Sequence, residues 1–199
     1  EMRNEYGLAG AAVQGSIDSA DVLVACFDFQ GYTKWSRTYG GSRPDVAYGA
    51  TYAMNDDRIV LCGRTKSFGV LTDDDVYVLL LDPYASGDTL GTRALVQSGK
   101  DIAYGVTVGP GGEPVVAGYA RSGTGYNDDV YVVQMTPDLK NVNWDQRYGL
   151  TSTDQGWGIC SEISSSDMFV VVGRSDDPSG AGRYDLYMTK LDLGGNVMQ

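Results

Sequence analysis

The chain contains no histidine among its 199 residues. Histidine is the general base of Ser-His-Asp and Cys-His catalysis, and it is the commonest protein ligand of metals such as zinc. Its absence therefore excludes both kinds of nucleophilic catalysis and nearly all catalytic zinc chemistry.

Basic residues are scarce as well: 15 Lys and Arg stand against 26 Asp and Glu, which gives a net charge of −11. Nucleic acids and anionic membranes would be repelled by such a surface, so neither is expected as a partner. No apolar run approaches the roughly 18 residues of a membrane span, which predicts no membrane insertion. The acidity is interpreted as serving solubility. The alternative is that it attracts cations or basic protein surfaces.

A strand-rich unit recurs along the chain. One landmark is a glycine that closes an apolar strand, at Gly10, Gly63, Gly118 and Gly173, with spacings of 53, 55 and 55 residues. A second landmark is an aspartate that opens the next strand, at Asp21, Asp75, Asp129 and Asp185, with spacings of 54, 54 and 56. A period near 50 with several short strands per unit is typical of β-propellers.

The most complete unit predicts four strands, at residues 47–54, 58–65, 76–82 and 89–97. The third is almost continuously apolar, which indicates a strand buried on both faces, between two neighbouring sheets. The fourth is more polar, as an outer edge strand is expected to be.

These patterns predict an all-β fold: a β-propeller, or part of one, with about four four-stranded blades in a single segment, 1–199. The blades divide as a partial blade at 1–41, blades at 45–99 and 101–150, and a nearly complete blade at 154–199. Three arrangements stay open: a closed four-bladed ring, a propeller assembled from several chains, and a fragment of a larger propeller. We expect the last, with about six to eight blades in all.

The three cysteines include no CxxC pair. Cys62 and Cys160 align with small or apolar residues in the other units, which predicts buried free thiols. Cys26 aligns with Leu80 but also with Gln134, so its environment is open. A disulfide between Cys26 and Cys62 stays an alternative.

Several segments carry a resemblance to a known family. They are DVYVVQMTPDLKNVNWDQRYG at 129–149, DLYMTKLDLGGN at 185–196, KWSRTYGG at 34–41 and the glycine-closed strands. Together they resemble the bacterial-type β-propeller repeats called SBBP-like. The resemblance implies a scaffold or binding module of a large secreted or surface protein, with no catalytic residues. The unit at 75–99 departs from the pattern because it lacks both Trp and Tyr-Gly, and we expect a different outer strand there, as a face for a partner.

Aromatic residues recur at one position of the first strands, as Tyr48, Tyr104 and Trp157. They are interpreted as filling the wedge between neighbouring sheets. The alternative is that they line a funnel that stacks on a sugar ring or a peptide.

No cofactor is expected, and a calcium site is kept as the alternative because oxygen-rich acidic stretches offer Asp73, Asp74, Asn127 and Asp128 as ligands. No D-x-[DN]-x-[DN]-G loop supports it. The aspartates repeated in every unit are interpreted as structural, since they can accept hydrogen bonds from loop N–H groups.

The leading hypothesis is therefore a non-enzymatic scaffold or protein-interaction module of an extracellular or cell-surface assembly. Its partners would be basic protein surfaces or copies of itself, bound by loops at 66–74, 120–128 and 174–184. The alternative is a lectin-like, carbohydrate- or small-ligand-binding propeller. A glycan-active enzyme is the weakest hypothesis. It rests on Glu162, the one acidic residue of the first strands that aligns with uncharged residues in the other units.

Overall fold

The computed structural model describes residues 5–13, 20–54, 57–69, 73–96, 99–121, 127–149, 153–162, 167–176 and 184–198. Within these ranges every regular element is a β-strand, and neighbouring strands pair antiparallel in four sheets. The expectation of an all-β fold is confirmed. Among the described residues, no helix has the length and apolarity needed to cross a membrane.

Each sheet is built from one continuous stretch of chain. Sheet A holds β1 (Glu5–Val13), β2 (Ala20–Asp28) and β3 (Thr33–Tyr39). Sheet B holds β4 (Asp45–Ala53), β5 (Arg58–Thr65), β6 (Asp75–Asp82) and β7 (Asp88–Leu95). Sheet C holds β8 (Asp101–Val108), β9 (Pro114–Arg121), β10 (Asp128–Met135) and β11 (Val142–Tyr148). Sheet D holds β12 (Asp154–Glu162), β13 (Met168–Ser175) and β14 (Asp185–Asp192). The strands of sheet B agree with the predicted ones to within two residues at each end.

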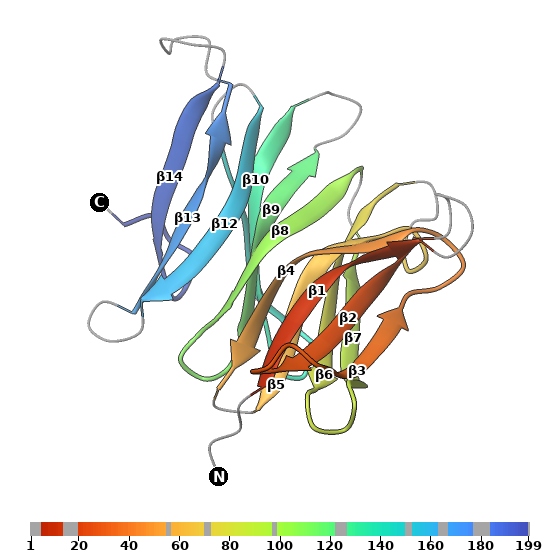
Figure 1. The fold of residues 1–199 in the computed structure, drawn as a ribbon. Coiled ribbons are helices and arrows are strands. Elements are labelled where there is room, and N and C mark those ends of the chain that lie inside the picture. The colour runs from red at the N-terminus through yellow and green to blue at the C-terminus, as the bar shows by residue number, and fades with distance from the viewer. Residues whose placement is uncertain are drawn as a thin grey trace.

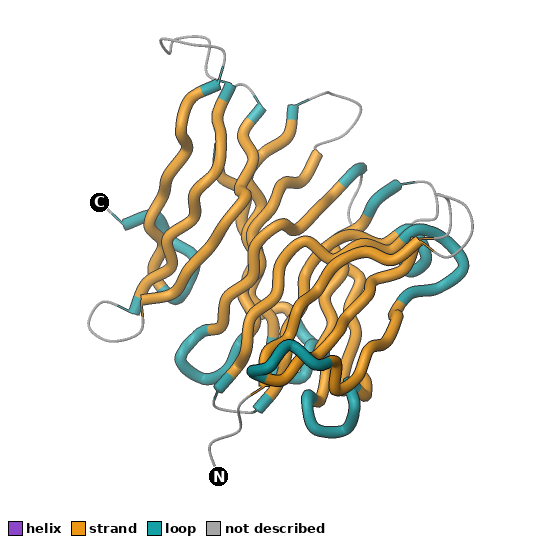
Figure 2. The backbone as a smooth tube through the Cα atoms, viewed as in Figure 1, coloured by secondary structure: helices purple, strands orange, loops and turns teal. Residues whose placement is uncertain are grey.

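The four sheets follow one another as an arc, A against B, B against C and C against D (Figures 1 and 2). The first strands of sheets B, C and D are direct neighbours, so β8 lies between β4 and β12. Sheets A and D stand at the two ends of the arc (Figure 1). Each of them therefore has one face that no other sheet covers.

Hydrophobic cores lie between successive sheets rather than within one sheet. In β6, Val78 and Leu80 pack toward sheet C, whereas Leu79 packs toward sheet A. All residues of β6 from Asp75 to Leu81 are buried. The prediction that this strand is covered on both faces is confirmed, and alternation of side chains across the strand is its cause.

Tryptophans of the fourth strands lock neighbouring sheets together. The indole N–H of Trp35 donates to the carbonyl of Pro83 (3.2 Å), and that of Trp144 donates to the carbonyl of Leu193 (2.8 Å). Each ring lies over a glycine of the next sheet's turn, and a Cβ on Gly87 would come within 2.7 Å of the ring of Trp35. The aligned tryptophans thus serve the same contact in two of the three junctions.

In the unit at 75–99, which lacks the tryptophan, the small residue is on the strand and the large residue is in the turn of the next sheet. Gly91 of β7 pairs with Leu80, the register position that Trp144 takes opposite Gln134 in sheet C. Leu139, buried in the turn of sheet C, approaches Gly91 to fill the space. A large residue on the strand and a small one in the turn have exchanged places. The loss of Trp is therefore explained by internal packing, and this contact needs no external partner.

The cysteine predictions are correct in part. Cys26 and Cys62 are buried and free, so the disulfide alternative is excluded in this structure. Cys160 is exposed, and the prediction that it is buried was wrong. It is paired with Val170 in sheet D, and this face has no neighbouring sheet. Its counterpart Thr107 is buried because sheet D covers sheet C.

Candidate functional site: an aromatic groove on the inner strands

A β-bulge interrupts the first strand of sheets B, C and D at the same place. The pairing register shifts between Ala47 and Gly49, between Ala103 and Gly105, and between Gly156 and Gly158. The residue left without a cross-strand partner is the aromatic one: Tyr48, Tyr104 or Trp157. A bulge re-aims the side chain of the extra residue, so it leaves the alternation that would bury it.

The glycine that marks each repeat is required by this bulge. A Cβ on Gly63 would lie 1.8 Å from the carbonyl oxygen of Val46, immediately before the bulge. Gly118 and Gly173 have the same relation, again at 1.8 Å, to Ile102 and Gln155. No side chain fits at such a distance. The most visible landmark of the sequence is thus part of the device that presents the aromatic residues.

The three aromatic side chains lie on adjacent strands and come together. The rings of Tyr48 and Tyr104 are 5.1 Å apart and tilted by 48°, a favourable arrangement for aromatic pairs. Tyr48 is 45% exposed and Trp157 is 51% exposed. Residues that fill a wedge between sheets would be buried, so that interpretation does not hold for these two. Partial burial raises the pKa of Tyr104 and keeps its hydroxyl protonated at neutral pH.

An open groove of about 420 Å³ lies over these strands. Its lining joins the three predicted residues to two others: Tyr48, Tyr104, Gln155, Trp157 and Arg174. The volume is within the range of small-molecule sites, about 300–1,000 Å³. The structure thus brings all three sequence-predicted aromatics into one site.

Arg174, from the end of β13, is the one charged residue among the described residues of this lining. Its guanidinium lies 5.5 Å from the ring centre of Trp157 and 4.7 Å from that of Tyr184. Its Nε is buried without a hydrogen-bond partner, and the described residues give it no ion pair. The rings hold the guanidinium by cation–π attraction, which leaves its hydrogen-bond donors for a ligand.

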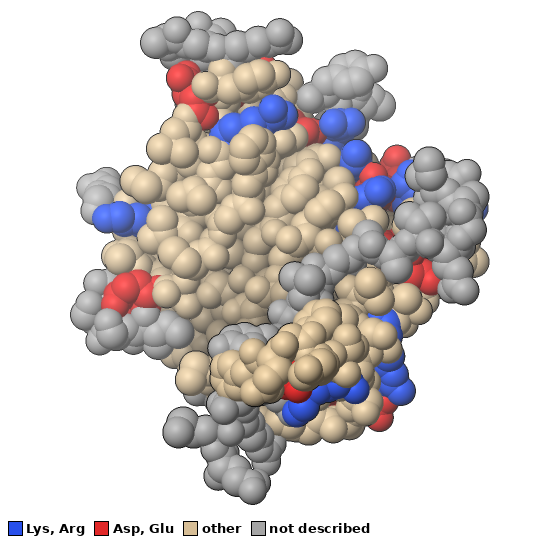
Figure 3. Space-filling view, viewed as in Figure 1, with Lys and Arg blue, Asp and Glu red and all other residues tan. Residues whose placement is uncertain are grey.

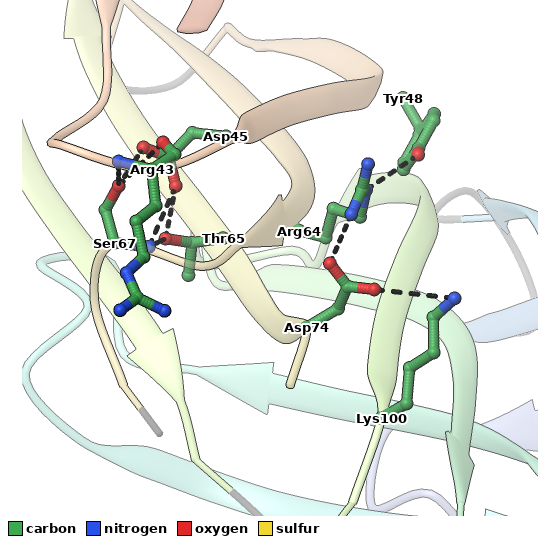
Figure 4. Close-up of polar contacts among 8 residues, drawn as sticks. All are labelled: Arg43, Asp45, Tyr48, Arg64, Thr65, Ser67, Asp74 and Lys100. Atoms are coloured by element: carbon green, nitrogen blue, oxygen red, sulfur yellow. Dashed lines mark hydrogen bonds and ion pairs between the residues drawn. The ribbon is translucent and has the colours of Figure 1, made fainter. Parts of the chain in front are cut away.

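The arginine at the matching position of sheet B is engaged differently (Figure 4). Arg64 forms an ion pair with Asp74, and its Nε donates to the hydroxyl of Tyr48 at 3.1 Å. Asp74 also lies 3.4 Å from the ammonium group of Lys100. Arg64 and Arg174 therefore differ in their partners. A buried carboxylate neutralises Arg64, whereas the described residues give Arg174 no carboxylate partner.

The residues predicted as calcium ligands have protein partners instead. Asp74 is bound by Arg64 and Lys100, as above. Asp128 accepts from Nε of Arg121 (2.8 Å) and from the Gln155 amide (2.7 Å). Asp73 and Asn127 are exposed. Over the described ranges, no three acidic, Cys or His side chains are grouped so as to hold a metal ion. In sheet C the buried carboxylate orients Gln155, one wall of the groove.

The aspartates at the sheet junctions are structural, as interpreted from their repetition. Asp45 is fully buried and accepts from the backbone N–H of Gly41 at 2.8 Å. It also accepts from the hydroxyl of Ser67 at 2.6 Å (Figure 4). Asp101 is its counterpart between sheets B and C. Burial raises the pKa of Asp101 to about 7, and the charge of Asp75 adds to the effect.

The other predicted positions lie away from the groove or beyond the described residues. Residues 70–72, 122–126 and 177–183 of the three predicted binding loops lie outside the described residues. Glu162 pairs with Met168 at the end of β12 opposite to Gln155, so it does not line the groove. Sequence reasoning missed Gln155 and Arg174. A signal was present for Arg174, because it begins one of the predicted loops.

In comparisons with known proteins, no family model matches this chain, and no curated protein is similar to it in sequence.

Proposed function

We propose that the chain is an arc of a β-propeller of the SBBP-like type, and that it acts outside the cell as a non-enzymatic binding module. Stacked sheets serve as the rigid scaffold. The groove on β4, β8 and β12 is the binding site, and its ligand is a carbohydrate that carries a carboxylate group.

One observation supports this function best: half-exposed aromatic rings surround an arginine to which the described residues give no acidic partner. Exposed Trp and Tyr faces suit the apolar face of a sugar ring. Gln155 offers an amide for hydroxyl groups, and Arg174 offers a planar pair of donors that matches a carboxylate. The chain has a net charge of −11, so an arginine without an acidic partner among the described residues is unusual in it and favours an anionic ligand in the groove.

A ligand-binding role also agrees with the lack of catalytic groups in the groove. The described residues of its lining include no carboxylate, and a glycoside hydrolase needs a pair of them. The rings and the guanidinium bind and orient, and none of them is a general base at neutral pH.

The test is a tryptophan-fluorescence titration with uronic-acid oligosaccharides and with neutral oligosaccharides of the same linkage. We expect a saturable change with the acidic ligand, because Trp157 is half-exposed beside Arg174. R174Q should weaken binding of the acidic ligand by about tenfold or more, since hydrogen bonds to charged groups contribute about 1.5–3 kcal/mol. W157A should abolish the spectral change.

The matched control is Tyr32→Ala, which removes an aromatic residue that is 72% exposed and outside the groove. This variant should bind like the unmodified chain. An absence of saturable binding for both oligosaccharides would refute the proposed function. Equal binding of both, unchanged in R174Q, would refute the role of the carboxylate.

A further inference from the structure

Each sheet has two unlike faces, defined by alternate residues of its third strand in sheets B, C and D and of β2 in sheet A. The front face carries Val22 and Val24 in sheet A, Val76 and Val78 in B, Val130 and Val132 in C, and Leu186 and Met188 in D. The back face carries Leu23 and Ala25 in sheet A, Tyr77 and Leu79 in B, Tyr131 and Val133 in C, and Tyr187 and Thr189 in D. The front of each sheet packs on the back of the next, in all three junctions. The stacking therefore has one direction.

One front face has no partner, that of sheet D. Leu186 is 80% exposed, Met188 is 59% exposed and Val172 is 40% exposed. Their counterparts in sheet C are Val130, Val132 and Ala117, each with 0% exposure. The repeat thus places apolar side chains at positions that are buried wherever another sheet follows.

One back face also has no partner, that of sheet A. Leu23, Ala25 and Phe27 of β2 are partly exposed. The residues of β6 in the same register positions, Tyr77, Leu79 and Leu81, are buried at 4%, 2% and 0% exposure. The back of sheet A thus presents side chains at the positions that the third strands of sheets B and C turn toward the preceding sheet. The internal junctions also use the first strand of the following sheet, and the described residues of sheet A include no such strand.

Both open faces look toward the same side of the arc, at its two ends (Figure 1). Figure 3 shows that the surface over β12, β13 and β14 on this side carries few charged side chains. An apolar area of this kind on a chain of net charge −11 is typical of an interface.

We propose that the front of sheet D binds the back of sheet A of a second copy of this chain. A twofold axis then makes two such contacts and satisfies all four open faces, so the pair is closed. Two copies of four sheets give eight, which is within the usual range of about four to eight blades. The argument rests on continuity with the internal junctions, and it is independent of the ligand.

The first measurement is the mass of the full chain in solution, by light scattering after size exclusion at several concentrations. We expect a species of twice 21.3 kDa that dissociates on dilution. A mass of 21.3 kDa at the highest soluble concentration would overturn the proposal.

Two variants identify the faces. L186D places a charge on the front of sheet D, and F27D places one on the back of sheet A. Each should give a monomer, since each breaks both contacts of the closed pair. Mixing the two variants should restore association, because one front and one back remain intact. The matched control is L90D. Leu90 lies on β7 of sheet B, is 52% exposed and belongs to neither of the two open faces, so this variant should leave the mass unchanged.

Other pairings give other results. If two D faces pair with each other, F27D stays associated on its own, and mixing it with L186D leaves L186D monomeric; that result would overturn the proposal. Circular dichroism and a thermal melt confirm that each variant is folded. If L186D does not fold, M188D takes its place, and if F27D does not fold, L23D takes its place. The expected results are the same.

Discussion

Sheets C and D are built from the same repeat, and they differ in what covers them. In β10 every residue from Val130 to Met135 except Tyr131 and Gln134 is essentially inaccessible, with 0% exposure. In β14 half-buried and exposed side chains alternate up to Lys190, and Leu186 is 80% exposed. The sequences VYVVQM and LYMTKL are both apolar at their first three and last positions, and they differ by Thr for Val and Lys for Gln in between. Burial in this fold is therefore set by the neighbouring sheet more than by the strand itself.

The largest difference between the two sheets is expected at the landmark glycine. In Gly118→Ala the new Cβ would lie 1.8 Å from a carbonyl oxygen, inside a sheet held on both sides. We expect a loss of about 3 kcal/mol or more in the free energy of unfolding, because backbone must move in a packed interior. Gly173→Ala makes the same clash at the end of the arc, where sheet D can shift, and should cost less. Urea denaturation of both variants gives the values; equal losses would show that an outer sheet is as rigid as an inner one.

Truncation of matched core positions should give the next largest effect. Val132→Ala removes two methyl groups from a residue with 0% exposure, and we expect a loss of about 1–2 kcal/mol. Met188→Ala, at the same position of sheet D, should cost less than about 0.5 kcal/mol in the dilute monomer. Thermal and urea unfolding at low protein concentration measure both. A larger loss for Met188→Ala would contradict the open face.

A third effect, on the pH dependence of stability, is expected at the junction of sheets B and C. The pKa of Asp101 is raised from 3.8 to about 7, chiefly by burial. The folded state therefore holds a proton that the unfolded state releases between these pH values, and its stabilising contribution is lost as the pH rises from about 4 to about 7. Asp101→Asn keeps the acceptor for the N–H of Arg121 and cannot ionise.

Over this pH range, the free energy of unfolding should fall by about 1–3 kcal/mol less in Asp101→Asn than in the unmodified chain. Stability measured in urea at several pH values checks it. An identical pH dependence in both proteins would mean that Asp101 is ionised in the fold.

The arrangement of strands was predictable because its signals are local. Apolar continuity in 76–82 predicts a strand covered on both faces, and β6 is buried on both. Turn residues and glycine positions predict the strand ends to within two residues in sheet B. Alternation and turn chemistry operate over a few residues, so one sequence is enough to find them.

What sequence reasoning missed depends on contacts between distant residues. Cys160 was predicted to be buried because alignment with Thr107 carries no information on whether a sheet covers it. Gly91 stands where other sheets have a tryptophan, and Leu139 lies in a turn where they have a glycine. This exchange can be recognised only when both sides of the junction are known. Arg174 enters the site because a bulge turns Trp157 toward it.

The central claim is that stacked sheets protect the middle of the arc and leave its ends uncovered. Hydrogen exchange followed by mass spectrometry tests it directly, with peptides that cover β10 and β14 at low protein concentration. The account predicts that the amides of β10 are among the slowest to exchange and that those of β14 exchange much faster. Equal protection of the two strands in the dilute monomer would contradict it.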